Sequence, residues 1–334
     1  MRASHALRWL AGGVLVLWCG VFLRMETTEK SMVRALIVQP NRSGWAVQLL
    51  YQFPEAAADA SDAVAEIRSC SAEDATLPLA LHKAERELPK AANYRLCEYL
   101  LLDETASQTD ALKLEEFLQT EPVSRLSARV LFVAGIEALA EETPPGSGAE
   151  SEETDAAPET LPGALLQAAE DTAARAPHLY ECAAGAVIPL LKIGEDRVTW
   201  QKESCLLTVQ GSTRLSPNET AMAQLLQERT MPVEFALEGE TVTLRRCVVS
   251  VEAEGNGFAV MLTGQCRAGT PPVAESVCRQ LEALCEETIV RAWQSDADLL
   301  RLGAVRALKE GPGAFFTTKN ACPEVRASVK MLDL

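Results

Sequence analysis

The chain has 334 residues and carries 47 acidic against 31 basic side chains, a formal net charge of −16. This balance argues against a nucleic-acid partner, because contacts to a phosphate backbone need clustered positive charge. It argues equally against electrostatic adhesion to anionic lipid headgroups.

An uncharged segment, Trp9–Leu23, stands almost at the start of the chain, after Arg2 and Arg8. No comparably apolar segment follows it. Residues 1–30 are therefore predicted to deliver the rest of the chain to a membrane and to leave it on the membrane surface. Basic residues on the N-terminal side favour a cytoplasmic N-terminus with the remainder exported.

Three interpretations of this segment are open. A helix of this length rises about 22 Å, short of the roughly 30 Å hydrocarbon core, which suits a removable signal peptide. No good pair of small residues marks a cleavage site, however, so an uncleaved anchor is the first interpretation. A bacterial lipoprotein acylated at Cys19 is the second, although Trp18 stands where such signals normally have a small residue. A cleaved and secreted form is the third.

Residues 31–140 are predicted to form a first α+β domain. Two β-rich runs, Met32–Gln39 and Trp45–Phe53, flank a turn and indicate a hairpin. Apolar residues spaced for one helical stripe come next: Leu77, Leu81, Ala84 and Leu88. The remaining predicted elements are a strand at Tyr94–Leu102, a helix at Asp110–Thr120, a strand at Ala128–Ala134 and a short helix from Ile136. This order implies a mixed sheet backed by helices.

Residues 141–160 contain seven acidic residues, three prolines and no basic residue. Such a composition cannot bury enough apolar surface to offset the entropy lost on ordering. The segment is predicted to be an acidic disordered linker, which divides the exported part of the chain in two.

A middle α+β domain, 161–230, and a C-terminal α+β domain, 231–334, are predicted after the linker. In the middle domain, Ser216 and Glu219 form a capping box with Pro217 at the first helical position. The other predicted elements are a helix at Leu161–Ala176, strands at Ala186–Lys192, Cys205–Gln210, 241–253 and 258–267, a long helix from Val277 through Ile289, a helical piece at Leu299–Leu308 and a last strand at Val325–Leu332.

The C-terminal hairpin permits a prediction of register. A type I′ turn at Asn256-Gly257, the preferred sequence for that turn, would place Cys247 opposite Cys266. The two residues would form a hydrogen-bonded pair with Cα atoms about 5.5 Å apart. That distance permits a disulfide, but the orientation is the poorer of the two pair types. We therefore expect two adjacent buried thiols.

Ten cysteines are many for an exported chain, yet they form no C-x-x-C pair. The histidines are few and far apart, so no zinc-ligand spacing can be assembled. Most of the cysteines are accordingly predicted to be small buried hydrophobic residues.

Catalytic motifs are absent from the sequence: there is no G-x-S-x-G, H-E-x-x-H, P-loop or strand-linked G-x-G-x-x-G pattern. Asp296 and Asp298 could form a carboxylate pair, but capping of a helix N-terminus is the favoured interpretation. His82 is predicted to lie on the surface, and His178 has no visible partner. The sequence thus predicts no enzyme, no cofactor and no metal site.

Three further stretches carry a resemblance. The first comprises TLPLALHKAERELPKAANYRLCEYLLLDE and LEEFLQTEPVSRLSARVLFVAG, and the second is PLLKIGEDRVTWQKESCLLTVQGSTRLSPNETAMAQLL. The third joins IVRAWQSDADLLRLGAVRALKE to the closing CPEVRASVKMLDL. With the opening hairpin, they resemble the Ger(x)C family, the C subunits of spore germinant receptors, from about residue 32 to 334. Where that family has the first glycine of Asp-x-x-Gly-x-Gly, this chain has Arg301.

The resemblance implies a membrane anchor followed by three consecutive α+β domains with mixed sheets. It implies a non-enzymatic subunit on the outer face of the spore's inner membrane. The implied partners are a polytopic A-type subunit and a transporter-like B-type subunit. The alternative is a tethered extracytoplasmic solute-binding or cell-envelope scaffold protein without a role in germination.

Overall fold

The computed structural model describes residues 30–52, 67–120, 127–137, 160–183, 185–194, 197–227, 232–237, 240–266 and 275–332. The predicted anchor up to residue 29, including Cys19, lies outside these ranges. The acidic segment 141–160 also lies outside them, apart from Thr160. None of the helices in the described ranges is both long and apolar enough to cross a membrane.

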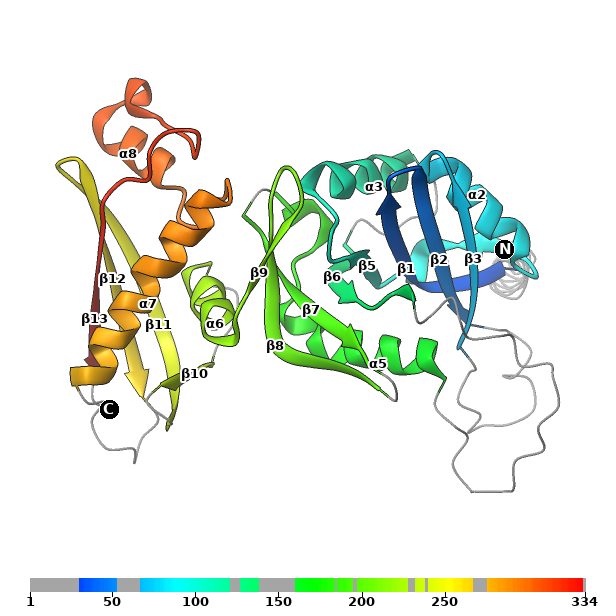
Figure 1. Cartoon of the computed structure of the whole chain (residues 1–334), viewed down its shortest axis with the longest axis horizontal. Coiled ribbons are helices and arrows are strands. Elements are labelled where there is room, and N and C mark those ends of the chain that lie inside the picture. The colour runs from blue at the N-terminus through cyan, green and yellow to red at the C-terminus, as the bar shows by residue number, and fades with distance from the viewer. Residues whose placement is uncertain are drawn as a thin grey trace, which may run out of the picture.

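Two mixed β-sheets with helices on their faces make up the described chain, which confirms the predicted α+β class (Figure 1). The first sheet has nine strands in the order β3-β2-β1-β5-β6-β7-β8-β9, with β4 beside β1. Its strands are β1 (Lys30–Asn41), β2 (Gly44–Gln52), β3 (Ile67–Asp74), β4 (Ala91–Asn93), β5 (Tyr99–Asp103), β6 (Arg129–Ala134), β7 (Val187–Ile193), β8 (Val198–Leu207) and β9 (Ser212–Leu215).

The second sheet has the order β10-β11-β12-β13. Its strands are β10 (Val233–Leu237), β11 (Glu240–Glu254), β12 (Gly257–Cys266) and β13 (Val325–Leu332). The helices are α2 (Leu77–Glu87), α3 (Gln108–Thr120), α5 (Leu161–Thr172), α6 (Pro217–Leu226), α7 (Glu275–Gln294) and α8 (Leu302–Glu310). Short 3₁₀ turns are η2 (Tyr94–Leu96), η3 (Ala173–Arg175), η4 (Leu179–Glu181) and η5 (Pro312–Ala314).

The middle of the first sheet, β1-β5-β6-β7, is parallel and covered on both faces. Strands in such a position are apolar at both alternating positions, and all of β5 is buried. In β1, Leu36 and Val38 belong to the core under α2 and α3, whereas Ala35 and Ile37 belong to the core under α5. The helices therefore sandwich the sheet.

This sheet continues across the boundary expected at 141–160. β6 and β7 pair in parallel, with Phe132 beside Leu190. Parallel neighbours need a crossover connection, and α5 provides it by packing on the face opposite α2 and α3. The expected domains 31–140 and 161–230 thus share one sheet, which corrects the division drawn from composition alone.

Most predicted elements lie within a few residues of the observed ones, and β13 has the predicted bounds. The strand predicted at Tyr94–Leu102 begins only at Tyr99, because Tyr94–Leu96 forms a 3₁₀ turn. The sequence pattern misses β3, a polar strand at the edge of the sheet with only alternate residues partly buried. It also misses the short strands β9 and β10.

Helix side chains occupy both edges of the second sheet. Asn218 of α6 forms two hydrogen bonds with the backbone of Ala236 on β10, at 2.9 and 3.0 Å. At the other edge, glutamates one turn apart on α7 accept from backbone N–H groups of β13 at 2.8 and 2.9 Å, and the pairs are Ala327–Glu286 and Val329–Glu282. Unpaired strand edges are templates for intermolecular pairing, so these contacts protect the sheet.

The β11-β12 hairpin has a different register from the predicted one. Gly255 and Asn256 form its two-residue loop, so that Glu254 pairs with Gly257. Of the two loop residues only Gly255 has a positive φ, +52°, as in a type II′ turn with glycine first. Gly257 meets a different need, because a Cβ there would lie 2.6 Å from the Glu324 carbonyl oxygen.

The register separates Cys247 from Cys266, so the predicted pair of facing thiols is wrong. Cys266 pairs with Leu244, and Cys247 lies in a bulge of β11. A Cβ added to Gly264 would be 3.0 Å from the Cys247 sulfur, which places that sulfur beside the glycine. Between Val248 and Glu254 the pairing differs from the predicted register by two residues. A slip of two residues leaves these side chains on their original faces, so the hydrophobic pattern could not reveal it.

The start of α8 depends on one carboxylate and one glycine. Asp298 accepts hydrogen bonds from the backbone N–H groups of Leu302 and Gly303, at 2.9 and 3.3 Å, and is thus a helix cap, as predicted. A Cβ on Gly303 would lie 1.9 Å from the Phe316 carbonyl oxygen. Arg301 adopts the left-handed conformation with φ +54°, at the position where the resembled family has glycine.

This geometry predicts opposite effects for two substitutions in one motif. Gly303→Ala should destabilise the protein by about 2–3 kcal/mol, because the backbone must shift to admit the methyl group. Arg301→Gly should stabilise it by about 1 kcal/mol or less, since relief of left-handed strain exceeds the added freedom of the unfolded chain.

Urea unfolding measures both effects. Gly313→Ala is the matched control, because no atom lies within 4 Å of its added Cβ. Equal stability of the Gly303→Ala and Gly313→Ala proteins would contradict the close approach at Gly303.

Candidate functional site

Helix α6 lies between the two sheets and is buried on every side (Figure 1). Seven successive residues, Thr220–Leu226, are buried, as expected for a helix enclosed by protein. The predicted capping box is confirmed: Ser216 N–H donates to the Glu219 carboxylate at 2.8 Å, and Glu219 N–H donates to the Ser216 hydroxyl at 3.4 Å. Val187 and Leu206 of the first sheet share one apolar cluster with α6 and the second sheet.

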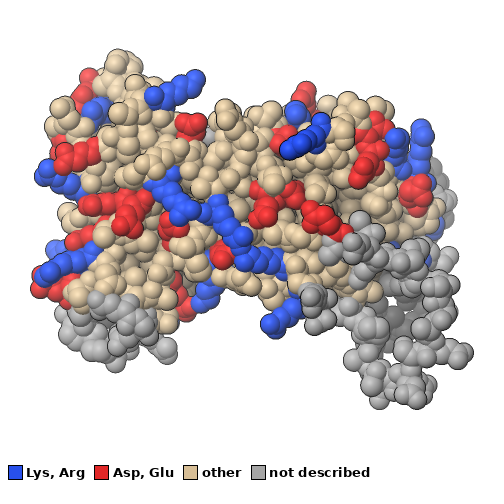
Figure 2. Space-filling model, in the orientation of Figure 1, with Lys and Arg blue, Asp and Glu red and all other residues tan. Residues whose placement is uncertain are grey.

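A network of ion pairs runs alongside this helix, and Figure 2 shows a band of basic side chains across the middle of the molecule. Arg291 of α7 pairs with Glu219 at 2.5 Å and donates to the Arg214 carbonyl oxygen at 2.8 Å. Arg214 of β9 pairs with Glu203 of β8 at 2.5 Å, and Lys192 of β7 approaches the same carboxylate at 3.2 Å. The network therefore connects α7 with three strands of the first sheet.

The two carboxylates of this network have lowered pKa values. Burial acts to raise the pKa of Glu203, but hydrogen bonds and charges from Arg214 and Lys192 outweigh it. Burial likewise opposes the lowered pKa of Glu219, which results from hydrogen bonds to Ser216 and from Arg291. Each carboxylate therefore stabilises the fold in its ionised form.

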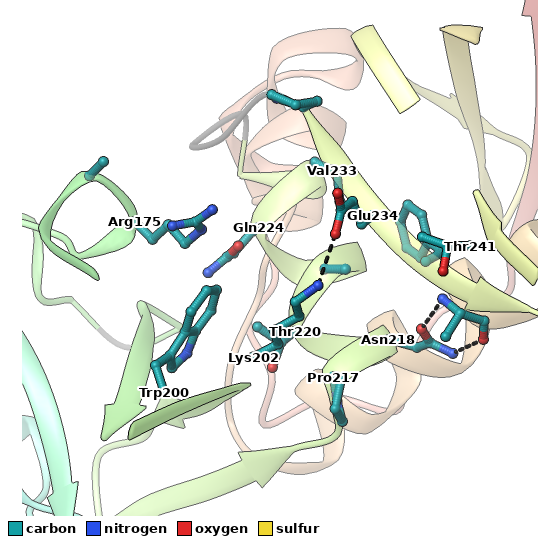
Figure 3. A pocket seen from close by; sticks show the side chains of 15 residues that line it. Arg175, Trp200, Lys202, Pro217, Asn218, Thr220, Gln224, Val233, Glu234 and Thr241 are labelled. Carbon is teal, nitrogen blue, oxygen red and sulfur yellow. Dashed lines mark hydrogen bonds and ion pairs between the residues drawn. The ribbon is translucent and has the colours of Figure 1, made fainter. Parts of the chain in front are cut away.

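Beside α6, a cleft of about 400 Å³ opens between the sheets (Figure 3). On one wall, the Arg175 guanidinium lies over the Trp200 ring, 4.7 Å from its centroid. The indole N–H of Trp200 donates to the Glu203 carbonyl oxygen at 2.8 Å. Lys202 reaches from β8 to Glu234 of β10 at 2.8 Å, so this ion pair bridges the two sheets.

A bulge in β8 gives Lys202 this direction. Between Trp200 and Ser204, the strand has extra residues opposite β7, and Lys202 adopts φ +59°. Pro189 on β7 has no N–H to donate, and prolines inside sheets are found at edges or bulges. Bulges frequently redirect a side chain near a functional site, and positive φ at a residue with a Cβ stores strain.

The lining of the cleft is suited to binding by charge and by an aromatic face. The described part of its lining contains a single carboxylate, Glu234, which is paired with Lys202, and no histidine or cysteine. Within the described ranges, no three His, Cys, Asp or Glu side chains are grouped so that they could hold a metal ion. Asp298 caps α8, and Asp296 lies in a turn with φ +59°, so these two residues serve the connection between α7 and α8.

The histidines singled out from the sequence lie away from the cleft. His82 is exposed, as predicted, with its Nδ1 3.1 Å from Glu85. His178 does have partners, contrary to the prediction: its Nδ1 lies 2.7 Å from the Ser127 carbonyl oxygen and its ring stacks on Tyr180. Both contacts fix the connection that precedes β7.

Eight cysteines have described side chains, and none of these eight is in a disulfide. Four of them are buried: Cys97, Cys182, Cys205 and Cys285. Burial raises the pKa of Cys285 to about 12 and that of Cys205 to about 11, so these thiols remain protonated at neutral pH. These four cysteines serve packing, as predicted. The other four described cysteines are only partly buried, so the prediction that most cysteines are buried holds for half of those described.

The sequence patterns did not identify the residues that line the cleft. Arg175, Trp200 and Glu234 come from separate elements, and no local spacing connects them. In the sequence, Lys202 falls between the strands predicted at Ala186–Lys192 and Cys205–Gln210, and no chemical motif marks its position.

No known family model and no curated protein matches this chain. Among solved structures, the crystal structure of the GerBC protein aligns with 89% of this chain and 97% of its own length, at 9% sequence identity and a TM-score of 0.43.

The ion-pair network predicts a pH-dependent contribution from Glu203. Because its pKa in the folded state is lowered from 4.5, its stabilising effect is complete above the unfolded value and is lost as pH falls through the folded value. Glu203→Gln should therefore cost about 1–2 kcal/mol at pH 7. The difference in unfolding free energy from the wild type should shrink as pH falls below the pKa of this glutamate in the unfolded chain.

Urea unfolding over a pH series tests this prediction. Glu287, exposed on α7, supplies the control Glu287→Gln, which should change the unfolding free energy by less than about 0.5 kcal/mol at each pH. A cost of Glu203→Gln that is constant with pH would contradict the ionic contribution.

Proposed function

We propose that this chain is a non-enzymatic, membrane-tethered subunit of a spore nutrient-germinant receptor. In this proposal Trp9–Leu23 forms the tether, and the folded body lies on the extracytoplasmic face of the spore's inner membrane. A-type and B-type receptor subunits are the proposed partners. The Ger(x)C resemblance of the sequence is the basis of each of these statements.

The observation that carries the proposal is where the resembling residues lie in the structure. Ser216 and Glu219 open the helix that joins the two sheets, and Asp298 and Gly303 fix the start of α8. Both motifs thus have a role in the architecture. Shared motifs of this kind support a shared fold, as expected for a subunit that acts through contacts.

The protected sheet edges fit this role. Asn218 and the glutamates of α7 occupy the backbone groups that strand addition would need at either edge of the second sheet. Contacts with other subunits are therefore proposed to involve side-chain surfaces. Helix α6 would hold the surfaces of the two sheets at a fixed distance from each other.

Deleting the gene tests the proposal. Vegetative growth and spore yield should be unchanged, while loss of spore refractility after nutrient addition should slow several-fold. The physical reason is that a receptor lacking one contact subunit cannot assemble its full set of interfaces.

Complementation makes this test specific. The wild-type chain and Gly313→Ala should restore the germination rate, whereas Gly303→Ala, which disturbs the fold at α8, should restore it poorly. Normal germination of the deletion strain with every nutrient tested, in a background without paralogues, would refute the proposed role.

The tether yields a separate prediction. Protein extracted from membranes should retain residues 1–23, because the uncleaved segment supplies the only anchor in this proposal. Intact mass measurement decides the matter. A new N-terminus at Cys19 carrying a diacylglycerol mass would show instead that the chain is a lipoprotein.

A further inference from the structure

The cleft beside α6 contains an arginine whose charge helps to lower the pKa of Glu234 but which forms no ion pair within the described ranges. Elsewhere at this junction Lys192, Arg214 and Arg291 each pair with a glutamate. Arg175 differs, because within the described ranges no carboxylate lies at ion-pair distance from it and its contact is the face of Trp200. The N–H groups at the edge of its guanidinium can therefore donate hydrogen bonds to another acceptor.

The surroundings hold this donor in place. Trp200 is itself fixed by the hydrogen bond from its indole N–H to the Glu203 carbonyl oxygen. Arg175 belongs to the 3₁₀ turn after α5, so its backbone is anchored at the end of a packed helix. A guanidinium supported on an aromatic face loses little freedom when it binds a planar oxyanion with two parallel hydrogen bonds.

A second cation faces the same space. Lys202 lies on the strained bulge of β8 and contacts Glu234 at 2.8 Å. Figure 3 shows Arg175, Trp200 and Lys202 around one opening.

Size and charge together limit the class of ligand. A volume of about 400 Å³ falls within the range of small-molecule sites and is too small for a folded partner. Among the described residues of the lining, Arg175 and Lys202 exceed the single carboxylate by one positive charge, although the whole chain carries −16. The excess favours an anion over a neutral or cationic molecule.

We propose that this cleft is a binding site for a small organic oxyanion, a molecule with a carboxylate or phosphate group. Arg175 receives the oxyanion through its guanidinium edge, Lys202 adds a second positive charge, and both sheets contact the bound molecule. The site is independent of the receptor proposal, because it can be tested on the isolated chain.

Titration of the purified full-length chain in detergent tests the site. Succinate and inorganic phosphate are the two probes, neutral succinamide is the control ligand, and ionic strength is held constant with sodium chloride. At least one oxyanion should bind saturably, as followed by tryptophan fluorescence and isothermal titration, and the one that binds identifies the group. Succinamide should not bind.

Substitutions locate the binding. Arg175→Gln should raise the Kd by about tenfold or more, and Arg175→Lys by less, because lysine retains the charge without the two-pronged geometry. Lys202→Gln should raise the Kd several-fold. Arg95→Gln, an exposed arginine on η2 far along the chain, is the matched control and should leave the Kd unchanged.

The readout separates binding from folding, because the urea midpoint of each variant is measured alongside its Kd. Failure of both oxyanions to bind saturably overturns the proposal. It is also overturned if Arg175→Gln binds like the wild type, or if Arg95→Gln weakens binding as much, since the interaction would then be non-specific.

Discussion

The burial of α6 between the two sheets is the constraint on which the rest of this structure depends. A helix whose residues from Thr220 to Leu226 are all buried has no face left for water. Each fully buried aliphatic side chain contributes about 1.5–3 kcal/mol, so separating either sheet from the helix would expose part of the apolar cluster that contains Met222 and Leu225. The ion pairs of Glu219 and Glu203 lie around this apolar contact and fix its orientation. The cleft exists because the two sheets are held apart by the width of one helix.

Local sequence signals predicted much of the fold. The capping box at Ser216, the helical stripe after Leu77 and the strand Val325–Leu332 each depend on neighbours in sequence, and each is present. Long-range pairing was less predictable. Phe132 pairs beside Leu190 although an acidic segment separates them, because a composition signal cannot show which strands become neighbours. The predicted position of the hairpin turn was wrong for a related reason. Gly257 is needed for its close approach to Glu324, a residue distant in sequence.

The candidate site was beyond the reach of sequence patterns. Arg175, Lys202 and Glu234 meet only because α6 brings the two sheets together, and a bulge opposite Pro189 turns Lys202 toward the second sheet. Strain is likewise invisible in a sequence: Arg301 occupies a left-handed position, and only the comparison with a family motif marked that position as unusual. The motifs that did stand out, at Asp298 and Glu219, proved to be helix caps. The sequence patterns therefore identified helix caps and did not identify the residues of the cleft.

Native-state hydrogen exchange measures most directly whether α6 unites the two sheets. The slowest amides of β5 and β12 should exchange through one opening reaction, with the same free energy and the same dependence on urea, because neither sheet can open without uncovering α6. Mass spectrometry of peptides from each strand supplies both values on the unmodified chain. An opening of β12 at clearly lower free energy, with its own shallower urea dependence while β5 stays protected, would contradict this account.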